Sequence, residues 1–237
     1  DDGLRLHGWF LPAAGPVRGT LVHCHGNAGN ITGHYRFVAW LPERGWNVLV
    51  FDYRGFGESP GRPSREGAVA DVHAAVDYAR ARPDVDANRV VLFGQSLGGS
   101  VAIVAAAERD DLAGLAVEGA FASYQEEARF VCRQRWWLWG VSGLVSRWFV
   151  ADGADPIYAV GRVPAVPKLF ICGTADRIVD CQQTVVLHDE AGEPKELWML
   201  EDEGHTTALI DDEPEESGMT GRARFVRFLD STVNPQG

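Results

Sequence analysis

The sequence has no uncharged apolar run of roughly 18 residues, the length that a helix needs to cross a bilayer. Its first residues, Asp1 to Leu4, do not form the charged and apolar pattern of a secretory signal peptide. These absences favour a cytoplasmic protein. Because the sequence does not begin with Met, an anchoring segment before Asp1, and through it membrane association, stays an open alternative.

Cysteine is also scarce. Four cysteines in 237 residues (Cys24, Cys132, Cys172 and Cys181) are too few and too irregularly spaced for a disulfide framework or a zinc site. We therefore expect buried free thiols and no metal, with a Cys172–Cys181 bridge as the alternative.

Basic residues are outnumbered. The chain has 22 Lys and Arg against 33 Asp and Glu, a formal net charge of -11, so it would repel a phosphate backbone. Nucleic acid is excluded as an expected partner. Eight acidic residues gather between positions 201 and 216, where we expect a solvated loop, the alternative being an influence on the charge of the substrate.

Apolar residues, at 46%, are plentiful enough for a sizeable core. Short apolar runs alternate with segments of helical periodicity, which predicts an α/β fold with a mostly parallel sheet covered on both faces. The predicted strands are 20–23, 47–51, 89–93, 113–117 and 167–172, and the predicted helices are 67–82 and 97–108, with weaker ones at 30–41 and 221–230. No repeat or linker divides the chain, so we expect a single domain over 1–237.

The segment 122–160 interrupts this alternation. It carries the sequence RQRWWLWGVSGLVSRWFV between two predicted strands, and loops of that length are uncommon unless they serve a function. We interpret it as a cap or lid over the carboxyl edge of the sheet.

A nucleophile motif stands at the end of one predicted strand. Gly94-Gln95-Ser96-Leu97-Gly98 fits the pattern G-x-S-x-G and leads directly into a predicted helix, which is the context that the motif requires. Ser96 is the candidate nucleophile. A tight turn without chemistry is the alternative interpretation of the motif alone.

A serine nucleophile needs a base and an acid, which follow it in the order Ser, acid, His in this kind of fold. Asp176 comes just after the strand PKLFICG, two strands along from that of Ser96, and His205 follows a later apolar stretch. Asp180 is expected to cap a helix instead, and Asp202 is too close to His205 in sequence. His23 and His25 precede the nucleophile, which is the wrong order for this fold. The other histidines lie in a predicted strand or in or beside predicted helices, and we expect them to be exposed or hydrogen-bonded bystanders: His7, His34, His73 and His188.

An oxyanion hole requires two backbone N–H donors. The residue after the nucleophile, Leu97, supplies one, and the stretch LVHCHGNAGN has the form of a loop that supplies the other from Asn27 or, as the alternative, Ala28. The opposing interpretation of this stretch is an ordinary turn followed by a helix cap at Asn30.

These motifs together resemble the α/β-hydrolase superfamily, and HGNAGN, FDYRGFGESPGRPS and GQSLGG in that order look like its BEM46-like branch. The resemblance covers nearly the whole chain. It implies a triad of Ser96, Asp176 and His205, oxyanion donors at Asn27 and Leu97, and no cofactor or metal.

The sequence departs from the family pattern where Arg65 follows Pro63-Ser64 in place of the usual glutamate, a surface change that we expect to be neutral. The family's first strand and any amino-terminal anchor are missing, so the membrane attachment known in some relatives is not carried over. A Gly-x-Gly in RGFGESPG lacks the third glycine of a dinucleotide loop.

The expected function is hydrolysis of carboxylic esters with short to medium acyl chains through an acyl-enzyme on Ser96. The alternatives are a thioesterase for acylated proteins or lipids, then a peptidase, and a noncatalytic binding module built on the same scaffold. Serine at this position argues against dehalogenase and epoxide hydrolase chemistry, which would use aspartate, and against dienelactone hydrolases, which use cysteine.

Aromatic side chains of the cap are the candidates for the wall of the substrate pocket: Trp136, Trp137, Trp139, Trp148 and Phe149. Packing of the cap onto the domain is the alternative role for each of them. A third interpretation has the same stretch, with Arg133, Arg135 and Arg147, contacting a membrane surface.

Overall fold

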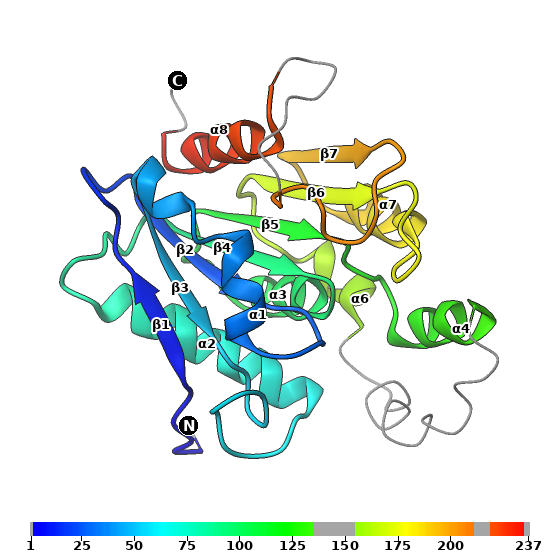
Figure 1. The fold of residues 1–237 in the computed structure, drawn as a ribbon, viewed down its shortest axis with the longest axis horizontal. Coiled ribbons are helices and arrows are strands. Elements are labelled where there is room, and N and C mark those ends of the chain that lie inside the picture. Colours follow the sequence, from blue (N-terminus) through cyan, green and yellow to red (C-terminus); the bar gives the residue numbers. More distant parts are fainter. Residues whose placement is uncertain (1, 135–154, 211–218, 235–237) are drawn as a thin grey trace.

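A seven-stranded sheet forms the centre of the protein, in a computed structural model that describes residues 2–134, 155–210 and 219–234. The strand order is β1-β3-β2-β4-β5-β6-β7, and β1 is antiparallel to β3 whereas the other pairs are parallel (Figure 1). The strands are β1 (Gly8–Leu11), β2 (Gly19–Cys24), β3 (Trp46–Phe51), β4 (Val90–Gln95), β5 (Gly114–Glu118), β6 (Lys168–Gly173) and β7 (Lys195–Leu200). This arrangement confirms the predicted α/β-hydrolase fold class.

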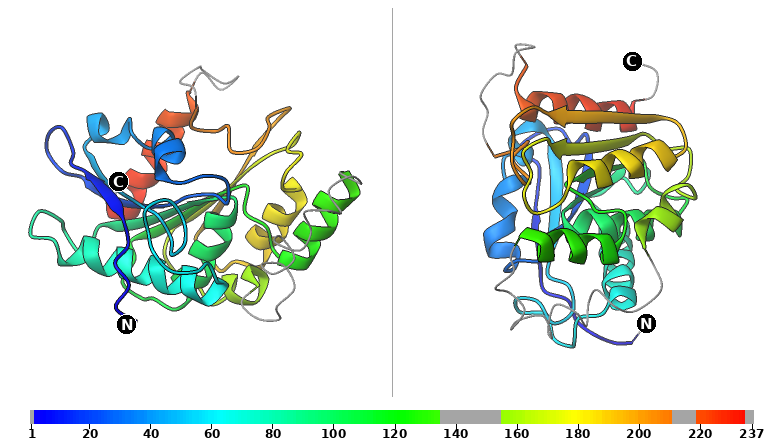
Figure 2. Two further views of the ribbon diagram at one scale, coloured as in Figure 1. Left: turned by 60° about the horizontal axis from the view of Figure 1, so that its bottom comes forward. Right: turned by 90° about the vertical axis from the view of Figure 1, so that its right-hand side faces the viewer.

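Helices cover both faces of the sheet (Figure 2). The helices α2, α3, α6 and α7 lie on one face, and α1 and α8 lie on the other. Their bounds are α1 (Ile31–His34), α2 (Arg65–Ala81), α3 (Leu97–Ala107), α4 (Tyr124–Gln134), α6 (Pro156–Val160), α7 (Cys181–Glu190) and α8 (Gly221–Val233). Two 3₁₀ helices, η1 (Tyr35–Phe37) and η2 (Leu41–Arg44), follow α1.

Two apolar cores result from the alternation of side chains along buried strands. Leu92 of β4 belongs to the core beneath α2 and α3, while its neighbours Val91 and Phe93 belong to the core beneath α8. All six residues of β4 are buried. This explains why the strands read as continuous apolar runs in the sequence.

The five predicted strands correspond to β2 through β6, and the strand of Asp176 lies two positions from that of Ser96 as expected. Asp180 caps α7, because its side chain accepts a hydrogen bond from the Gln182 amide at 3.0 Å. The helix expected over 30–41 is wrong in detail. There the Asn30 side chain caps a helix of only four residues, which passes into 3₁₀ geometry.

The segment 122–160 begins with α4 and ends with α6, while residues 135–154 lie outside the described residues. Arg65 corrects one expectation here. It is 6% exposed rather than on the surface, and its guanidinium lies 3.9 Å from the centre of the Tyr124 ring in α4. The departure from the family pattern therefore joins the start of α2 to this segment by a cation–π contact.

Across the residues that the structure describes, we find no helix that is both long and apolar enough to cross a membrane.

Candidate active site

Ser96 occupies the sharp turn between β4 and α3. Its φ of 55° and ψ of -123° are rare for a residue with a side chain, and its amide donates to the Glu118 carbonyl at 2.8 Å. A Cβ atom at Gly98 would stand 2.1 Å from the Cys24 carbonyl oxygen, so this turn needs glycine there. The sequence thus holds Ser96 in a strained conformation of the kind found at reactive sites.

His205 and Asp176 form a hydrogen-bonded pair at the same edge of the sheet. The distance from His205 Nδ1 to Asp176 Oδ2 is 2.6 Å, and the Asp176 side chain is only 1% exposed. The other carboxylate oxygen, Oδ1, accepts hydrogen bonds from the amides of Ile178 at 2.7 Å and Val179 at 3.0 Å. Asp176 is therefore fixed by its own loop and aimed at the histidine.

Gly119 connects this pair with the nucleophile turn. It directly follows Glu118, whose carbonyl receives the Ser96 amide, and a Cβ atom on it would stand 3.0 Å from His205 Cε1. The described residues contain no hydrogen bond between the Ser96 hydroxyl and the His205 ring. Hydrogen bonds of this kind often tighten only when substrate is bound.

The loop after β2 lies against the nucleophile turn. A Cβ atom at Gly26 would be 3.5 Å from the Ser96 Cβ atom. Tyr53 donates to the His25 carbonyl at 3.2 Å and His34 Nε2 donates to the Ala28 carbonyl at 2.6 Å, which together hold the loop. His34 thus supports this loop through a hydrogen bond, in agreement with the expectation of an exposed or hydrogen-bonded residue outside the chemistry.

The two expected oxyanion donors are the residues that directly follow Gly26 and Ser96 in the sequence. Leu97 is the buried first residue of α3 and Asn27 is exposed in the loop. Over the described part of the chain, neither backbone amide donates to another protein group, so both remain available for a ligand oxygen. The first turn of α3 adds the partial positive charge of a helix N-terminus.

Two other histidines are buried beneath the site and are neutral. Burial lowers the pKa of His23 to about 3 and that of His25 to about 4. Both are 1% exposed. Burial shields both rings from solvent and substrate, which agrees with the expectation that these two are not the base.

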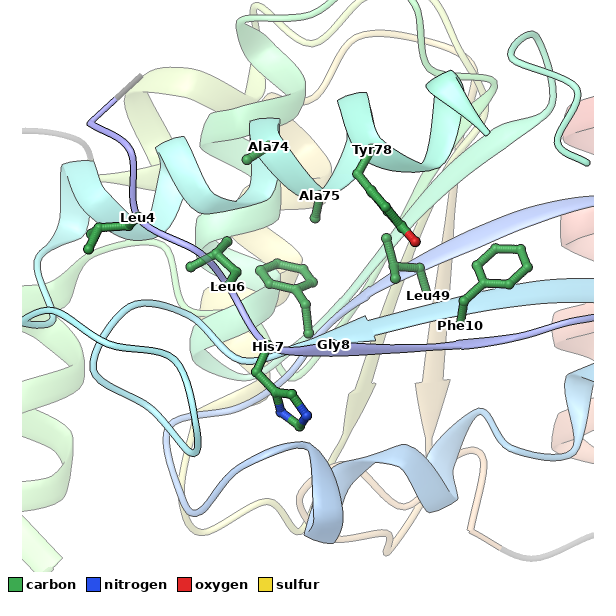
Figure 3. Close-up of a pocket in the computed structure, with 10 residues that line it drawn as sticks. Leu4, Leu6, His7, Gly8, Phe10, Leu49, Ala74, Ala75 and Tyr78 are labelled. Carbon is green, nitrogen blue, oxygen red and sulfur yellow. The ribbon is translucent and has the colours of Figure 1, made fainter. Parts of the chain in front are cut away.

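The aromatic pocket candidates Trp136, Trp137, Trp139, Trp148 and Phe149 lie outside the described residues, as do Arg135 and Arg147 of the membrane-contact hypothesis. An apolar cavity of about 330 Å³ lies elsewhere, between β1 and α2 (Figure 3). Leu6, Leu49 and Tyr78 line it, as does His7, whose ring points to the other side of the strand. None of the candidate site residues lines this cavity, so it is not the site of the chemistry.

A disulfide bond encloses the loop of Asp176. Cys172 of β6 and Cys181 of α7 are bonded, with their Cα atoms 5.2 Å apart. The expectation of free thiols is therefore wrong for this pair, and Cys24 is a buried free thiol as expected. The bond was only the alternative expectation because nothing in the sequence shows that the turn after β6 brings these two cysteines, nine positions apart, into contact.

Replacing both bonded cysteines, in Cys172→Ala/Cys181→Ala, should lower the free energy of unfolding by about 2–3 kcal/mol, because a cross-link of this length restricts the unfolded chain. Urea denaturation of the oxidised protein measures the change. Wild type with a reductant is the matched control and should shift to the midpoint of the variant. Equal midpoints for oxidised wild type and variant would contradict the prediction.

Glu127 of α4 is a buried carboxyl group near the pair of His205 and Asp176. It is 4% exposed and accepts a hydrogen bond from Gln183 Nε2 of α7 at 3.0 Å. Burial raises the pKa of Glu127 from 4.5 to about 7, with smaller contributions from the negative charges of Asp176 and Asp180. Glu127 thus changes its charge near neutral pH.

This raised pKa predicts a pH-dependent stability. The folded protein keeps a proton on Glu127 that the unfolded chain has already released, so stability should fall as the pH rises from about 4.5 to about 7 and then level off. The variant Glu127→Gln should remove the contribution of Glu127 to this decline and gain about 3 kcal/mol at pH 8. Thermal denaturation across this pH range tests it.

Glu126 offers the matched control, because it precedes Glu127 in α4 and is exposed. Glu126→Gln should keep the pH profile of the wild type. A decline that persists unchanged in Glu127→Gln would assign it to another group.

Glu118 and its neighbour Gln95 end two adjacent strands and are both buried. Neither was among the site residues predicted from the sequence. The signal was available, since a charged residue closes the otherwise apolar run GLAVE at the edge of the sheet where ligands bind.

The residues that the structure describes include no group of three or more His, Cys, Asp or Glu that could hold a metal ion.

This chain is similar to known proteins in sequence and in fold. The family described as "Serine aminopeptidase, S33" matches residues 15–163. Protein YfhR of Escherichia coli (strain K12) is 36% identical over 241 residues, which covers 99% of this chain and 80% of YfhR. Protein bem46 of Schizosaccharomyces pombe is 32% identical over 184 residues, which covers 76% of this chain and 59% of bem46.

Among solved structures, that of the esterase Pf2001 of Pyrococcus furiosus matches with a TM-score of 0.80 and 21% identity, covering 98% of this chain and 88% of Pf2001. A likeness at that identity concerns the fold. The match to the family, and the identity with YfhR and bem46, show that the similarity also holds for the sequence. The chain therefore belongs to the α/β-hydrolase family, in its BEM46-like branch.

Proposed function

We propose that this protein is a serine hydrolase that cleaves carboxylic esters through an acyl-enzyme on Ser96. The observation that carries the proposal is the 2.6 Å pairing of His205 Nδ1 with the buried Asp176 carboxylate, beside the strained turn of Ser96. A carboxylate in this position fixes the ring with its proton on Nδ1 and leaves Nε2 free to accept one. This is the arrangement that a weak serine nucleophile requires.

The reaction begins when the Ser96 hydroxyl attacks the acyl carbonyl and His205 Nε2 takes its proton. Asp176 stabilises the imidazolium that forms. The carbonyl oxygen becomes negative and accepts hydrogen bonds from the amides of Leu97 and Asn27, each worth roughly 100- to 1,000-fold in rate.

The tetrahedral intermediate then collapses. His205 returns its proton to the departing alcohol, and the acyl group stays on Ser96 as an ester. Water enters, His205 removes a proton from it, and the same oxyanion donors hold the second intermediate. This intermediate collapses when His205 gives that proton to the Ser96 oxygen and the carboxylic acid leaves. All the proton transfers in this scheme pass through one histidine.

The substrate class follows from the same chemistry. The acyl-enzyme scheme applies equally to a thioester, so acylated proteins or lipids are the alternative substrates. The proposed preference for short to medium acyl chains depends on the aromatic residues between 136 and 149. The neighbour Pf2001 is described as an esterase, which agrees with this choice.

A panel of p-nitrophenyl esters with short, medium and long acyl chains tests the proposal. One acyl thioester and one p-nitroanilide of the preferred acyl group complete the panel. We expect kcat/KM to be highest for a short or medium ester, lower for the thioester and lowest for the anilide. A faster thioester would favour the alternative substrates, and no turnover of any acyl compound would contradict the proposal.

A further inference from the structure

Three buried polar side chains form a continuous chain beneath the candidate active site. His23 of β2, Gln95 of β4 and Glu118 of β5 are each at most 2% exposed. His23 Nε2 lies 3.0 Å from Gln95 Oε1, and Gln95 Nε2 lies 2.7 Å from Glu118 Oε2. Polar groups this deeply buried cost stability unless they are fully hydrogen-bonded, so their retention calls for an explanation.

The direction of these hydrogen bonds follows from Gln95. Its amide nitrogen, Nε2, donates to Glu118 Oε2, so its side-chain oxygen, Oε1, faces His23. An oxygen of this kind only accepts, so His23 Nε2 carries a proton and donates to it. On the other side, the backbone amide of Ala208 donates to Glu118 Oε1 at 2.8 Å. Both carboxyl oxygens of Glu118 thus act as acceptors.

The chain ends at the segment that carries His205. Ala208 lies three residues after His205, and between them Thr206 has a φ of 54°, a conformation that costs energy for a residue with a branched side chain. Such a segment keeps its shape only when its surroundings hold it. The hydrogen bond to Glu118 supplies a fixed point inside the protein.

Glu118 also contacts the nucleophile. Its carbonyl oxygen accepts the Ser96 amide, and the next residue, Gly119, lies against the His205 ring. One residue therefore joins the turn of the nucleophile through its main chain and the segment of the base through its side chain.

We propose that Glu118 is a positioning residue of the hydrolase site, which fixes the His205 segment against the strand of Ser96 through the hydrogen bond to Ala208. The inference rests on the proposed function, because it assigns Glu118 a part in the reaction of Ser96, His205 and Asp176. Glu118 does not touch the reacting atoms.

Three variants test this role with the preferred p-nitrophenyl ester. Glu118→Ala removes the link and should lower kcat by about 100-fold with little change in KM, since a shift of the base by about 1 Å has an effect of that size. Glu118→Gln places two amide groups face to face unless Gln95 rotates, so its kcat should lie between those of Glu118→Ala and wild type.

The double variant Gln95→Glu/Glu118→Gln is the matched rescue. The new glutamine accepts from Ala208 and donates to the new glutamate, which also accepts from His23, so every hydrogen bond of the chain is restored with the carboxyl group moved by one residue. Its kcat should return to within about tenfold of wild type, because the two sites are in contact and the same hydrogen bonds are made again.

Several results would overturn the inference. Folded Glu118→Ala with the kcat of wild type would show that the link does not matter for the reaction. A folded double variant as slow as Glu118→Ala would show that the loss does not come from the hydrogen bonds. If Glu118→Ala does not fold, the double variant alone decides.

One measurement needs no variant. The Ala208 amide of wild type should be protected against hydrogen exchange, and rapid exchange there would also overturn the inference. Ser96→Ala, assayed in parallel, separates the two proposals. Retained activity in Ser96→Ala contradicts the proposed function and ends the inference with it, whereas lost activity leaves the result for Glu118 to stand by itself.

Discussion

Ser96→Ala should lose about 10⁵-fold or more in kcat for ester hydrolysis, because no other group of the site can form the acyl-enzyme. The fold should tolerate the change. Within the described residues the Ser96 hydroxyl makes no hydrogen bond to the protein, and alanine meets the same strain at a φ of 55° as serine does. The lost activity would therefore reflect chemistry and not unfolding.

Kinetics with the preferred ester, together with thermal denaturation, measure this effect. Ser231→Ala is the matched control, since Ser231 is an exposed serine in α8, the helix on the sheet face opposite α3. It should keep the activity of wild type. Ser96→Ala with more than a tenth of the wild-type kcat would exclude the acyl-enzyme scheme.

Asp176→Asn should lower kcat by about 10⁴-fold at neutral pH. The reason lies in the loop, where Oδ1 accepts hydrogen bonds from the amides of Ile178 and Val179. The carbonyl oxygen of asparagine must take that place, so its NH₂ group faces His205 Nδ1. The ring then carries its proton on Nε2 and is unable to accept the proton of Ser96.

Asp180→Asn provides the control within the same loop. Asp180 caps α7, and asparagine caps a helix about as well as aspartate, so this variant should keep both stability and activity. Kinetics at neutral pH compare the two. If Asp176→Asn and Asp180→Asn were equally active, Asp176 would have no part in orienting His205.

Much of the fold could be predicted from the sequence because buried parallel strands leave a clear pattern. The run from Val90 to Phe93 is apolar on both faces of the sheet, and its end at Gly94 and Ser96 marks the turn. Asp176 could be chosen over Asp202 because Asp202 is too close to His205 in sequence, whereas Asp176 follows the end of a strand two along from that of Ser96. The structure pairs that residue with His205.

Other features depend on contacts that no local pattern reveals. Arg65 was expected on the surface, yet α4 brings the Tyr124 ring over its guanidinium. The Cys172–Cys181 bond depends on how the turn after β6 folds back. In the sequence, Glu118 only follows the end of a predicted strand. Its proposed role depends on the hydrogen bond from Ala208, which is 90 residues further along the chain. The single-domain expectation for residues 1–237 stays a prediction.

The pH dependence of Glu127 follows from the same kind of long-range contact. Its carboxyl group is buried because α4 packs against α7, where Gln183 donates to it. Nothing in the sequence around Glu127 distinguishes it from the exposed Glu126 beside it. Burial by tertiary packing alone accounts for the difference between the two.

Labelling with a fluorophosphonate, followed by mass spectrometry of the digested protein, tests the central claim most directly. An activated serine should carry the phosphonate on the peptide that contains Ser96, and His205→Ala should prevent the labelling while leaving the protein folded. An unlabelled wild-type protein, an adduct on a different serine, or equally fast labelling of His205→Ala would contradict the account.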